Sequence, residues 1–366
     1  MTVYNHDRRT RRHTEQPMFL GADLGMQRYD EVRYPFFDDL STKQIGFFWI
    51  PDEVDCSRDA KDFKDLTPFE QHIFTSNLKR QIVLDSVQGR SPNLAFLPIV
   101  SLPEVERWIE TWAFFETIHS QSYTHIIQAV YADPTKVFDD INSVPEIVDC
   151  AKDISVAYDV LIQHINYDRF IQNRRNQDSL VMKQHIWKAV MAANILEGVR
   201  FYVSFACAWA FAELKKMEGN AKIIKFICRD ENLHLAGTQQ MLKLLVKDDK
   251  DFAKIAEEER ENDIAMFVAA VEQEKAWAKY LFKDGSMIGL SEELLCQYIE
   301  WIAHKRMTTL GLTSPYKGGS NPLPWTEKWI AGREVQVAPQ ETELTSYVSG
   351  GIKKDVDENT FKGVKL

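Results

Sequence analysis

Long segments with helical hydrophobic periodicity alternate with short polar or proline-marked breaks along most of the chain. Apolar residues recur three and four positions apart, which places them on one face of a helix. No stretch alternates apolar and polar residues for long enough to predict a sheet. The pattern therefore predicts an all-α protein with main helical segments at Phe36–Trp49, Thr67–Gly89, Glu104–Tyr131, Pro145–Ile171, Gln184–Met217, Ala221–Val246, Asp251–Phe282 and Ser291–Thr309.

Both ends of the chain differ from this helical body. Residues 1–33 carry many charges and little periodicity, and they are predicted to form an N-terminal arm. Residues 34–313 make up the helical domain. Glycine and proline mark residues 314–339 as an irregular segment, and residues 340–366 are predicted to form a flexible tail.

Composition narrows the classes of function. The chain has 366 residues, of which 45% are hydrophobic, so it can bury a large core. Its net charge of −10 argues against binding to nucleic acid or to an anionic membrane. No uncharged apolar run is long enough to span a membrane, and the five dispersed cysteines indicate free thiols in a reducing compartment. We therefore expect a cytoplasmic protein.

Two of the predicted helices contain a Glu-x-x-His pair, Glu116 with His119 and Glu231 with His234. Residues three apart share a helix face, so each pair places a carboxylate beside an imidazole. A chain with 54 acidic residues and 9 histidines contains such a pair by chance, so a single pair indicates little. The context of the two pairs has to decide whether they bind a metal.

Each pair follows a lone acidic residue in the preceding apolar helix. Asp85 precedes Glu116 by 31 residues, and Glu197 precedes Glu231 by 34 residues. This repeated order predicts two related helical hairpins. Glu197 lies inside the most apolar helix, where an unpaired charge is costly, and separate surface ion pairs would not explain its position.

Four carboxylates and two imidazoles that face the interior of a helical bundle form the ligand set of di-iron and di-manganese carboxylate proteins. Mixed oxygen and nitrogen ligands favour iron or manganese over metals that prefer thiolates. The sequence therefore predicts a two-metal site with the ligands Asp85, Glu116, His119, Glu197, Glu231 and His234.

Tyr123 lies one helical turn beyond His119. A buried tyrosine is ordinarily a packing residue, but a phenol beside an oxygen-activating metal pair can lose an electron and a proton. Phe201, Phe205 and Ile227 lie one or two turns from Glu197 or Glu231 and can enclose the same space. We therefore expect Tyr123 to be the residue that the centre oxidises.

Four stretches closely resemble the small, radical-generating subunit of class I ribonucleotide reductase, in its class Ia form. They are W-A-F-F-E-T-I-H-S-Q-S-Y-T-H, L-E-G-V-R-F-Y-V-S-F-A-C, M-E-G-N-A-K-I-I-K-F-I-C-R-D-E-N-L-H-L and V-A-P-Q-E-T-E-L-T-S-Y. The resemblance extends from Pro17 to the C-terminus. It implies a ferritin-like helical bundle, a homodimer, and two iron ions per chain, with manganese as the alternative.

The resemblance also implies roles for single residues. One iron would be bound by Asp85, Glu116 and His119, and the other by Glu197, Glu231 and His234. Tyr123 matches the radical tyrosine of the family. The residues that match the hydrophobic pocket around that tyrosine are Phe201, Phe205 and Ile227. The residues that match the radical-transfer path are Trp49, Asp230, Glu341 and Tyr347.

The implied activity is shared between two subunits. This subunit would use O2 and a diferrous centre to oxidise Tyr123. A large subunit, bound through the C-terminal tail, would then reduce ribonucleotides to deoxyribonucleotides. Lys362 and Lys365 lie where the family tail is usually more acidic, and Phe115 replaces a smaller residue common at its position.

Two alternatives use the same kind of bundle. An iron-storage or ferroxidase protein needs no tyrosine beside the metal, and a di-metal monooxygenase needs no tail. Neither requires Trp49 or Tyr347. The joint presence of Tyr123, Trp49 and Tyr347 favours the reductase subunit.

Overall fold

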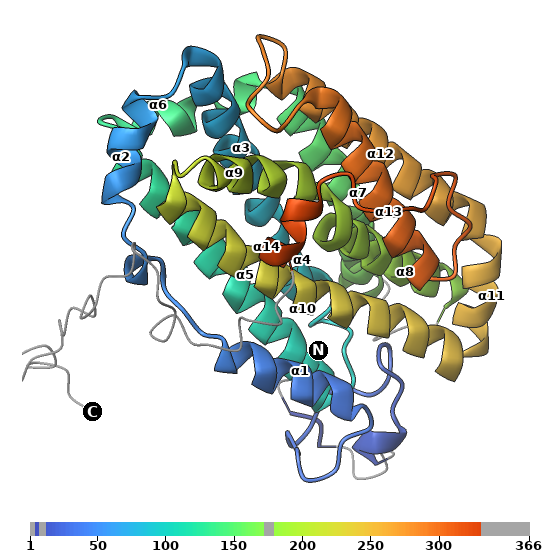
Figure 1. Cartoon of the computed structure of the whole chain (residues 1–366). Helices are drawn as coiled ribbons and strands as arrows, with labels where there is room; N and C mark the ends of the chain where they lie inside the picture. Colours follow the sequence, from blue (N-terminus) through green and yellow to red (C-terminus); the bar gives the residue numbers. More distant parts are fainter. Residues whose placement is uncertain (1–3, 7–11, 172–178, 331–366) are drawn as a thin grey trace, which may run out of the picture.

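The computed structural model of the chain describes residues 4–6, 12–171 and 179–330, which form a bundle of α-helices (Figure 1). Among these residues the only strand-like pairs are two isolated β-bridges, Phe19 with Val100 and Met287 with Leu290. The prediction of an all-α fold is confirmed. The predicted tail, residues 340–366, lies outside the described residues.

Helices of very different lengths make up the bundle. They are α1 (Pro35–Gly46), α2 (Ser57–Lys64), α3 (Pro68–Gln88), α4 (Ser91–Ala95), α5 (Pro103–Val130), α6 (Pro134–Asp139), α7 (Pro145–Asn166), α8 (Leu180–Ile195), α9 (Tyr202–Glu213), α10 (Glu218–Asp248), α11 (Lys250–Glu258), α12 (Arg260–Leu281), α13 (Glu292–Thr309) and α14 (Glu327–Ile330). Two π-helical turns, Tyr167–Ile171 and Leu196–Arg200, follow α7 and α8.

Local sequence explains where the long helices begin. The backbone N–H of Thr67 donates to Glu70 Oε2 at 2.8 Å, and the Thr67 hydroxyl accepts from the Glu70 backbone at 3.4 Å. This reciprocal capping box satisfies two N–H groups that the first turn of α3 leaves free. Proline at the first position opens both α3 and α5, as the sequence predicts.

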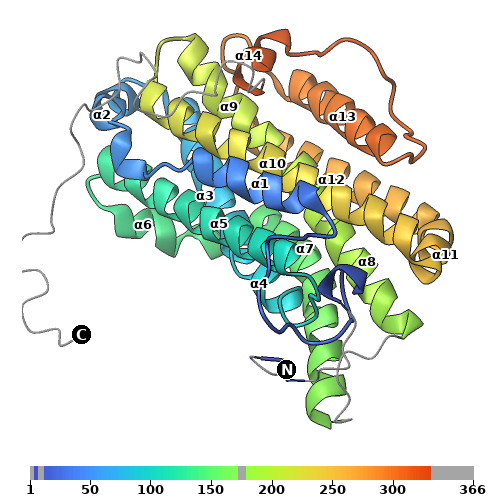
Figure 2. The same cartoon turned by 90° about the horizontal axis from the view of Figure 1, so that it is seen from below.

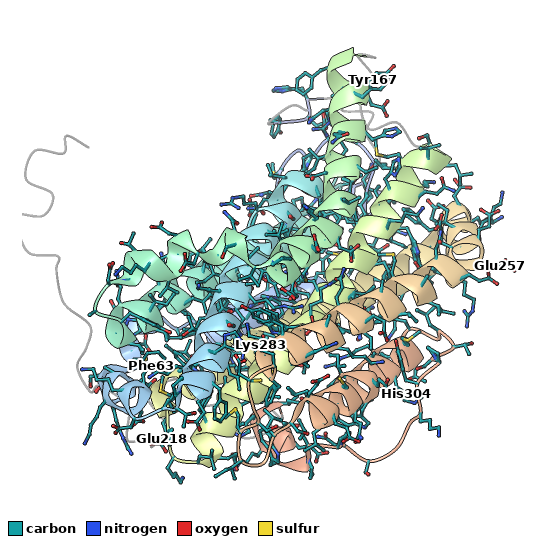
Figure 3. All side chains as sticks on the ribbon, turned by 90° about the horizontal axis from the view of Figure 1, so that it is seen from above. Phe63, Tyr167, Glu218, Glu257, Lys283 and His304 are labelled. Atoms are coloured by element: carbon teal, nitrogen blue, oxygen red, sulfur yellow. The ribbon has the colours of Figure 1, made fainter. Side chains whose placement is uncertain are left out.

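The long helices pack around a core that is rich in aromatic rings. Figure 2 shows α1, α5 and α10 side by side, and α3 contacts α5 and α9 within the bundle. Helices α12 and α13 pack on each other and on the segment between α8 and α9. Figure 3 shows side chains filling the space between the helices, with the end of α7 at Tyr167 projecting beyond the body. Five tryptophans are completely buried: Trp49, Trp108, Trp112, Trp209 and Trp277.

Three predicted helix boundaries are wrong. The predicted helix from Gln184 to Met217 is interrupted by the π turn, and the segment predicted from Asp251 to Phe282 divides at Glu259. The break expected at Glu218 lies earlier, because Lys215 and Met217 adopt left-handed backbone with φ of 60° and 53°. Helix α10 then starts at Glu218.

A carboxylate explains why α10 can start there. Asp59 Oδ1 accepts from the backbone N–H of Gly219 at 3.1 Å, and Oδ2 accepts from that of Asn220 at 2.6 Å. A β-carbon on Gly219 would lie 2.8 Å from the carbonyl oxygen of Asp55, so the glycine permits this close approach. Gly219 and Asn220, which lie in the predicted gap between the helices that end at Met217 and begin at Ala221, therefore belong to the first turn of α10.

Part of the predicted N-terminal arm is attached to the body. Met18, Phe19 and Leu20 are buried, and the backbone N–H of Leu20 donates to Ile99 O at 2.8 Å. Ser101 N–H donates to Met18 O at 3.0 Å. The arm therefore packs on the segment that leads into α5.

One apolar stretch has the length and composition of a membrane span. It covers Leu180–Glu213, with a mean hydropathy of 1.3 in its most apolar window. That whole window is buried inside the bundle, so the helices of the protein itself cover its apolar surface. The stretch is a core segment of this fold, and it includes the π turn.

A buried carboxylate joins α8 to α12. The indole of Trp187 donates to the two carboxylate oxygens of Asp263 at 3.1 and 3.3 Å. Burial raises the pKa of Asp263 to about 7, and the charge of Glu259 adds to this effect. The folded protein therefore keeps a proton that the unfolded chain loses near the ordinary pKa of 3.8.

Replacing Asp263 with asparagine is expected to change how stability depends on pH. Between the two pKa values the folded state binds the extra proton, so the free energy of unfolding of the parent falls as pH rises, by up to about 1.4 kcal/mol per unit. Asp263→Asn keeps an oxygen for the indole but lacks this titration. Its stability relative to the parent should be greater at about pH 8 than at about pH 5 in urea unfolding. An equal difference at both pH values would contradict the assignment.

Candidate metal centre

The six predicted ligands come together in the middle of the bundle. Asp85 comes from α3, Glu116 and His119 from α5, Glu197 from the π turn, and Glu231 and His234 from α10. All six side chains are completely buried. Their ligand atoms form two groups, and within each group the atoms lie within 4.8 Å of one another. The groups are Asp85, Glu116, His119 and Glu231, and Glu116, Glu197, Glu231 and His234.

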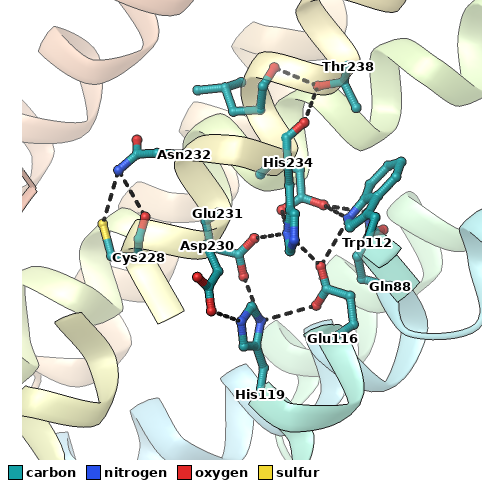
Figure 4. Close-up of polar contacts among 12 residues, drawn as sticks. Gln88, Trp112, Glu116, His119, Cys228, Asp230, Glu231, Asn232, His234 and Thr238 are labelled. Atoms are coloured by element: carbon teal, nitrogen blue, oxygen red, sulfur yellow. Dashed lines mark hydrogen bonds and ion pairs between the residues drawn. The ribbon is translucent and has the colours of Figure 1, made fainter. Parts of the chain in front are cut away.

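Glu116 and Glu231 belong to both groups and lie between the two histidine rings (Figure 4). His119 Nδ1 is 3.4 Å from Glu116 Oε2 and 3.2 Å from Glu231 Oε1. His234 Nδ1 is 3.0 Å from Glu116 Oε1 and 2.9 Å from Glu231 Oε2. The two carboxylates are therefore placed to bridge a pair of ions.

The other nitrogen of each histidine ring contacts a supporting side chain. His119 Nε2 is 3.3 Å from Asp230 Oδ2, and His234 Nε2 is 2.8 Å from the side-chain nitrogen of Gln44. This division, with one ring nitrogen toward the centre and the other held from behind, is typical of histidines that bind metals.

The unpaired atoms of the centre fit two divalent cations. Six ligand atoms make no hydrogen bond with any described residue. They are both carboxylate oxygens of Asp85, Glu116 Oε2, Glu197 Oε2, Glu231 Oε1 and His119 Nδ1. Buried acceptors left in this way cost free energy. Two divalent cations would bind these atoms and would balance the charge of four carboxylates. The mixed oxygen and nitrogen donors suit iron or manganese.

Without cations, the buried groups compete for protons. Burial raises the pKa of Asp85 and of Glu231 well above the ordinary values. Burial also opposes ionisation of Glu116, but His119 and His234 outweigh it and lower the pKa of Glu116 to about 2. Burial alone would lower the pKa of His119, yet Asp230 and Glu116 raise it to about 10. Metal binding must therefore displace protons from this centre.

Glu197 lies on the π turn rather than on the continuous helix that the sequence predicts. Its Oε1 accepts from Gln88 Nε2 at 2.5 Å and from Trp112 Nε1 at 3.1 Å. A π turn inside a helix often marks a functional site, because it changes the direction of a side chain. Among the described residues, Gln44 and Gln88 contact the ligands without having been predicted. Gln88 follows Asp85 by three positions on the same helix face, a signal that could have identified it.

Tyr123 is completely buried, and its hydroxyl makes no hydrogen bond within the described residues. Burial raises the pKa of Tyr123 well above its usual value, and the charge of Asp85 raises it further. The rings of Phe201 and Phe205 are buried and stacked with centroids 5.6 Å apart, and Ile227 is also buried. The enclosure of Tyr123 by these three residues stays a prediction.

A short chain of polar contacts leads away from His119. Trp49 Nε1 donates to Asp230 Oδ2 at 2.8 Å, and the same oxygen lies 3.3 Å from His119 Nε2. Arg229 Nε donates to Asp230 Oδ1 at 3.2 Å. The structure thus brings together Trp49, Asp230 and His119. The other two predicted radical-transfer residues, Glu341 and Tyr347, lie outside the described residues.

Comparisons with known proteins agree over nearly the whole chain. The family model described as ribonucleotide reductase, small chain, matches residues 27–322. Ribonucleoside-diphosphate reductase subunit beta of Haemophilus influenzae is 51% identical over 362 residues, covering 96% of each chain. Ribonucleoside-diphosphate reductase 1 subunit beta of Escherichia coli O157:H7 is 50% identical with the same coverage. The solved ribonucleotide reductase R2 subunit of Clostridium botulinum is 27% identical, with a TM-score of 0.78 over 90% of this chain and 98% of that chain.

Metal titration should separate the two ligand groups. Metal-free protein titrated with Mn(II), with free Mn(II) followed by electron paramagnetic resonance (EPR), should bind two ions per chain. Asp85→Ala should weaken one ion by at least about tenfold, whereas Glu116→Ala, which alters both groups, should weaken both. Asp263→Asn, a change to a buried acid outside the centre, is the matched control and should keep two ions. Parent-like binding by Glu116→Ala would contradict the proposed bridge.

Proposed function

The chain belongs to the ribonucleotide reductase small-chain family, and we propose that its buried centre binds two iron ions and generates a stored radical on Tyr123. Members of this family act with a large subunit to reduce ribonucleotides to deoxyribonucleotides. The observation that carries the proposal is the pair of ligand groups that share Glu116 and Glu231, with the Asp85 carboxylate near enough to the buried phenol of Tyr123 to raise its pKa. When bound, the two ions supply O2 activation and hence the oxidant for the phenol.

The six ligands form three pairs, according to the ion or ions that each pair would hold. Asp85 and His119 would hold one ion, Glu197 and His234 the other, and Glu116 and Glu231 both. Asp230 and Gln44 fix the histidine rings from behind, while Gln88 and Trp112 hold one oxygen of Glu197. The donor set suits iron and manganese alike, and we propose iron, with manganese as the alternative.

The group available to accept the phenol proton distinguishes the two candidate tyrosines. A phenol that loses an electron in a dry pocket must also release its proton to a nearby base. Burial raises the pKa of Tyr123 and the charge of Asp85 raises it further, so the Asp85 carboxylate lies near enough to accept the phenol proton. Tyr158 is a second buried tyrosine near the centre, but its hydroxyl donates to the amide oxygen of Gln88 at 3.0 Å. An amide is a poor base, so we assign the radical to Tyr123.

We propose that the radical leaves the centre through His119, Asp230 and Trp49. These side chains touch in sequence, and the Trp49 indole N–H donates to a carboxylate that can take its proton as the ring is oxidised. The carboxylate of Asp230 is held on its other side by Arg229. Glu341 and Tyr347 in the tail would continue the path toward the large subunit.

An exposed apolar patch supports the proposed homodimer. Ile45, Phe48 and Phe114 are 51%, 48% and 52% exposed, and the rings of Phe48 and Phe114 stack at 6.3 Å. The patch lies where the end of α1 meets α5, two helices that lie side by side in Figure 2. Clustered apolar side chains of this kind are typical of a protein interface. We assign the patch to the contact with a second copy of the chain.

The radical assignment can be tested with a matched pair of tyrosine variants. Parent protein treated with Fe(II) and O2 should give a tyrosyl EPR signal. Tyr123→Phe should remove the signal, because the phenol beside Asp85 is gone, whereas Tyr158→Phe should keep it. A signal that survives in Tyr123→Phe and disappears in Tyr158→Phe would place the radical on the other tyrosine. Replacing Fe(II) with Mn(II) in the same assay tests the alternative metal.

The dimer assignment can be tested with a charge in the apolar patch. Phe114→Asp should halve the mass measured by size-exclusion chromatography with light scattering, because the interface would have to bury a carboxylate. Phe170→Asp changes a ring that is 79% exposed in the π turn that follows α7, and it should leave the dimer intact. A Phe114→Asp protein that stays dimeric at the same concentration would place the interface elsewhere.

A further inference from the structure

The π turn that carries Glu197 needs external support. A helix with a π turn contains an extra residue, so its backbone groups do not all keep their usual helical partners. The turn spans Leu196–Arg200 and separates α8 from α9. Glu197 therefore depends on whatever holds this short segment in place, because its position is not set by a regular helix.

Arg306 on α13 supplies one such support. Its Nε donates to the carbonyl oxygen of Gly198 at 3.2 Å, and its Nη2 donates to the hydroxyl of Tyr202 at 2.7 Å. The guanidinium carbon also lies 5.3 Å from the centre of the Tyr202 ring. One cationic side chain thus joins the residue after Glu197 to the first turn of α9.

The same network reaches α10, which carries Glu231 and His234. The hydroxyl of Tyr202 lies 3.4 Å from Asn232 Oδ1, and Asn232 directly follows Glu231. Asn232 in turn donates to the backbone carbonyl of Cys228 at 2.9 Å (Figure 4). Arg306 therefore bonds directly to the residue after Glu197, whereas it reaches the residue after Glu231 only indirectly, through the Tyr202 hydroxyl and its longer contact with Asn232.

Close packing leaves the turn little room to move. A β-carbon on Gly198 would lie 2.9 Å from Leu235 Cδ1 and 3.4 Å from Arg306 Cγ. Leu235 follows His234, so the π turn lies directly against the part of α10 that carries a ligand. At the C-terminal end of the turn, Arg200 pairs with Asp153 at 2.5 Å and contacts Cys150 Sγ at 3.1 Å. Arginine contacts thus hold the middle and the C-terminal end of the segment.

We propose that Arg306 is a positioning residue for the metal pair, which fixes the π turn so that Glu197 reaches the ion it shares with His234. The inference rests on the proposed two-metal centre. It differs from a general role in stability because both direct hydrogen bonds of Arg306 go to the π turn and to the start of α9, whereas no direct bond within the described residues reaches the segment that carries Glu231. Asp85 and His119 are held by α3 and α5, which Arg306 does not contact through any described hydrogen bond or ion pair. Loss of Arg306 should therefore affect one ion and spare the other.

Mn(II) titration of the metal-free protein, followed by EPR, tests this asymmetry. In Arg306→Met one ion should bind with parent affinity, while the other is weakened by about 10- to 100-fold, the range found when a side chain that supports a ligand is removed. Arg306→Lys can restore one of the two donated bonds and should recover part of the loss. Gly198→Ala keeps Arg306 but pushes the π turn away from Leu235, and it should weaken the same ion.

Arg260→Met is the matched control. Arg260 Nη2 donates to the backbone carbonyl of Gly311 at 2.5 Å on the exposed surface, so the substitution removes a similar bond far from the ligands. It should bind both ions as the parent does. Circular dichroism and thermal unfolding of each metal-free variant establish that it is folded, and Gly198→Ala and Arg306→Lys carry the test if Arg306→Met does not fold.

The outcomes separate the inference from the function it rests on. If the parent binds two ions and folded Arg306→Met and Gly198→Ala bind both with parent affinity, the positioning role is wrong and the metal centre stands. Equal weakening of both ions in these variants would also overturn it, because a general loss of stability would then explain the effect. If the parent does not bind two ions, the metal centre is wrong and the inference falls with it.

Discussion

Six ionisable side chains are buried together in the middle of this helical bundle, where an unbalanced charge is costly. Four carboxylates and two imidazoles are completely buried, and several of their atoms have no partner among the described residues. A buried charge is tolerated only when it is paired, and here the arrangement of Glu116 and Glu231 between the two histidines leaves positions for two cations. The rest of the bundle can be understood as the means of holding these six groups against their mutual repulsion.

Rigid helices carry five of the ligands, and side chains behind them fix their directions. Asp230 and Gln44 contact the outer nitrogens of the histidines, while Trp112 and Gln88 bind Glu197. The sixth ligand depends on a π turn that two arginines hold in place. The same supports bear on the proposed choice of the oxidised residue, because the phenol of Tyr158 donates to the amide of Gln88, whereas the charge of the Asp85 carboxylate acts on the phenol of Tyr123. In our proposal the group that can accept the phenol proton therefore determines which tyrosine is oxidised.

The helical body could be predicted from the sequence, and so could the six side chains that the structure brings together, because both depend on spacing within a helix. Glu116 with His119 and Glu231 with His234 can be identified from their separation of three residues, and Asp85 and Glu197 from their apolar surroundings. The π turn could not be predicted, because Leu196–Arg200 has the composition of an ordinary buried helix. Gln44 and Arg306 could not be predicted for another reason: Gln44 reaches His234 from α1 and Arg306 reaches the π turn from α13, and only the tertiary fold brings those helices there. The early start of α10 likewise depends on Asp59, which lies far away in sequence.

The most direct test of the central claim is a crystal structure of the metal-loaded protein with anomalous diffraction measured at the metal edge. Two anomalous peaks are predicted, about 3.5–4 Å apart, with Glu116 and Glu231 contacting both and Asp85 and Glu197 each contacting one. A single peak within the six side chains, or peaks bound only by groups elsewhere on the protein, would contradict the account.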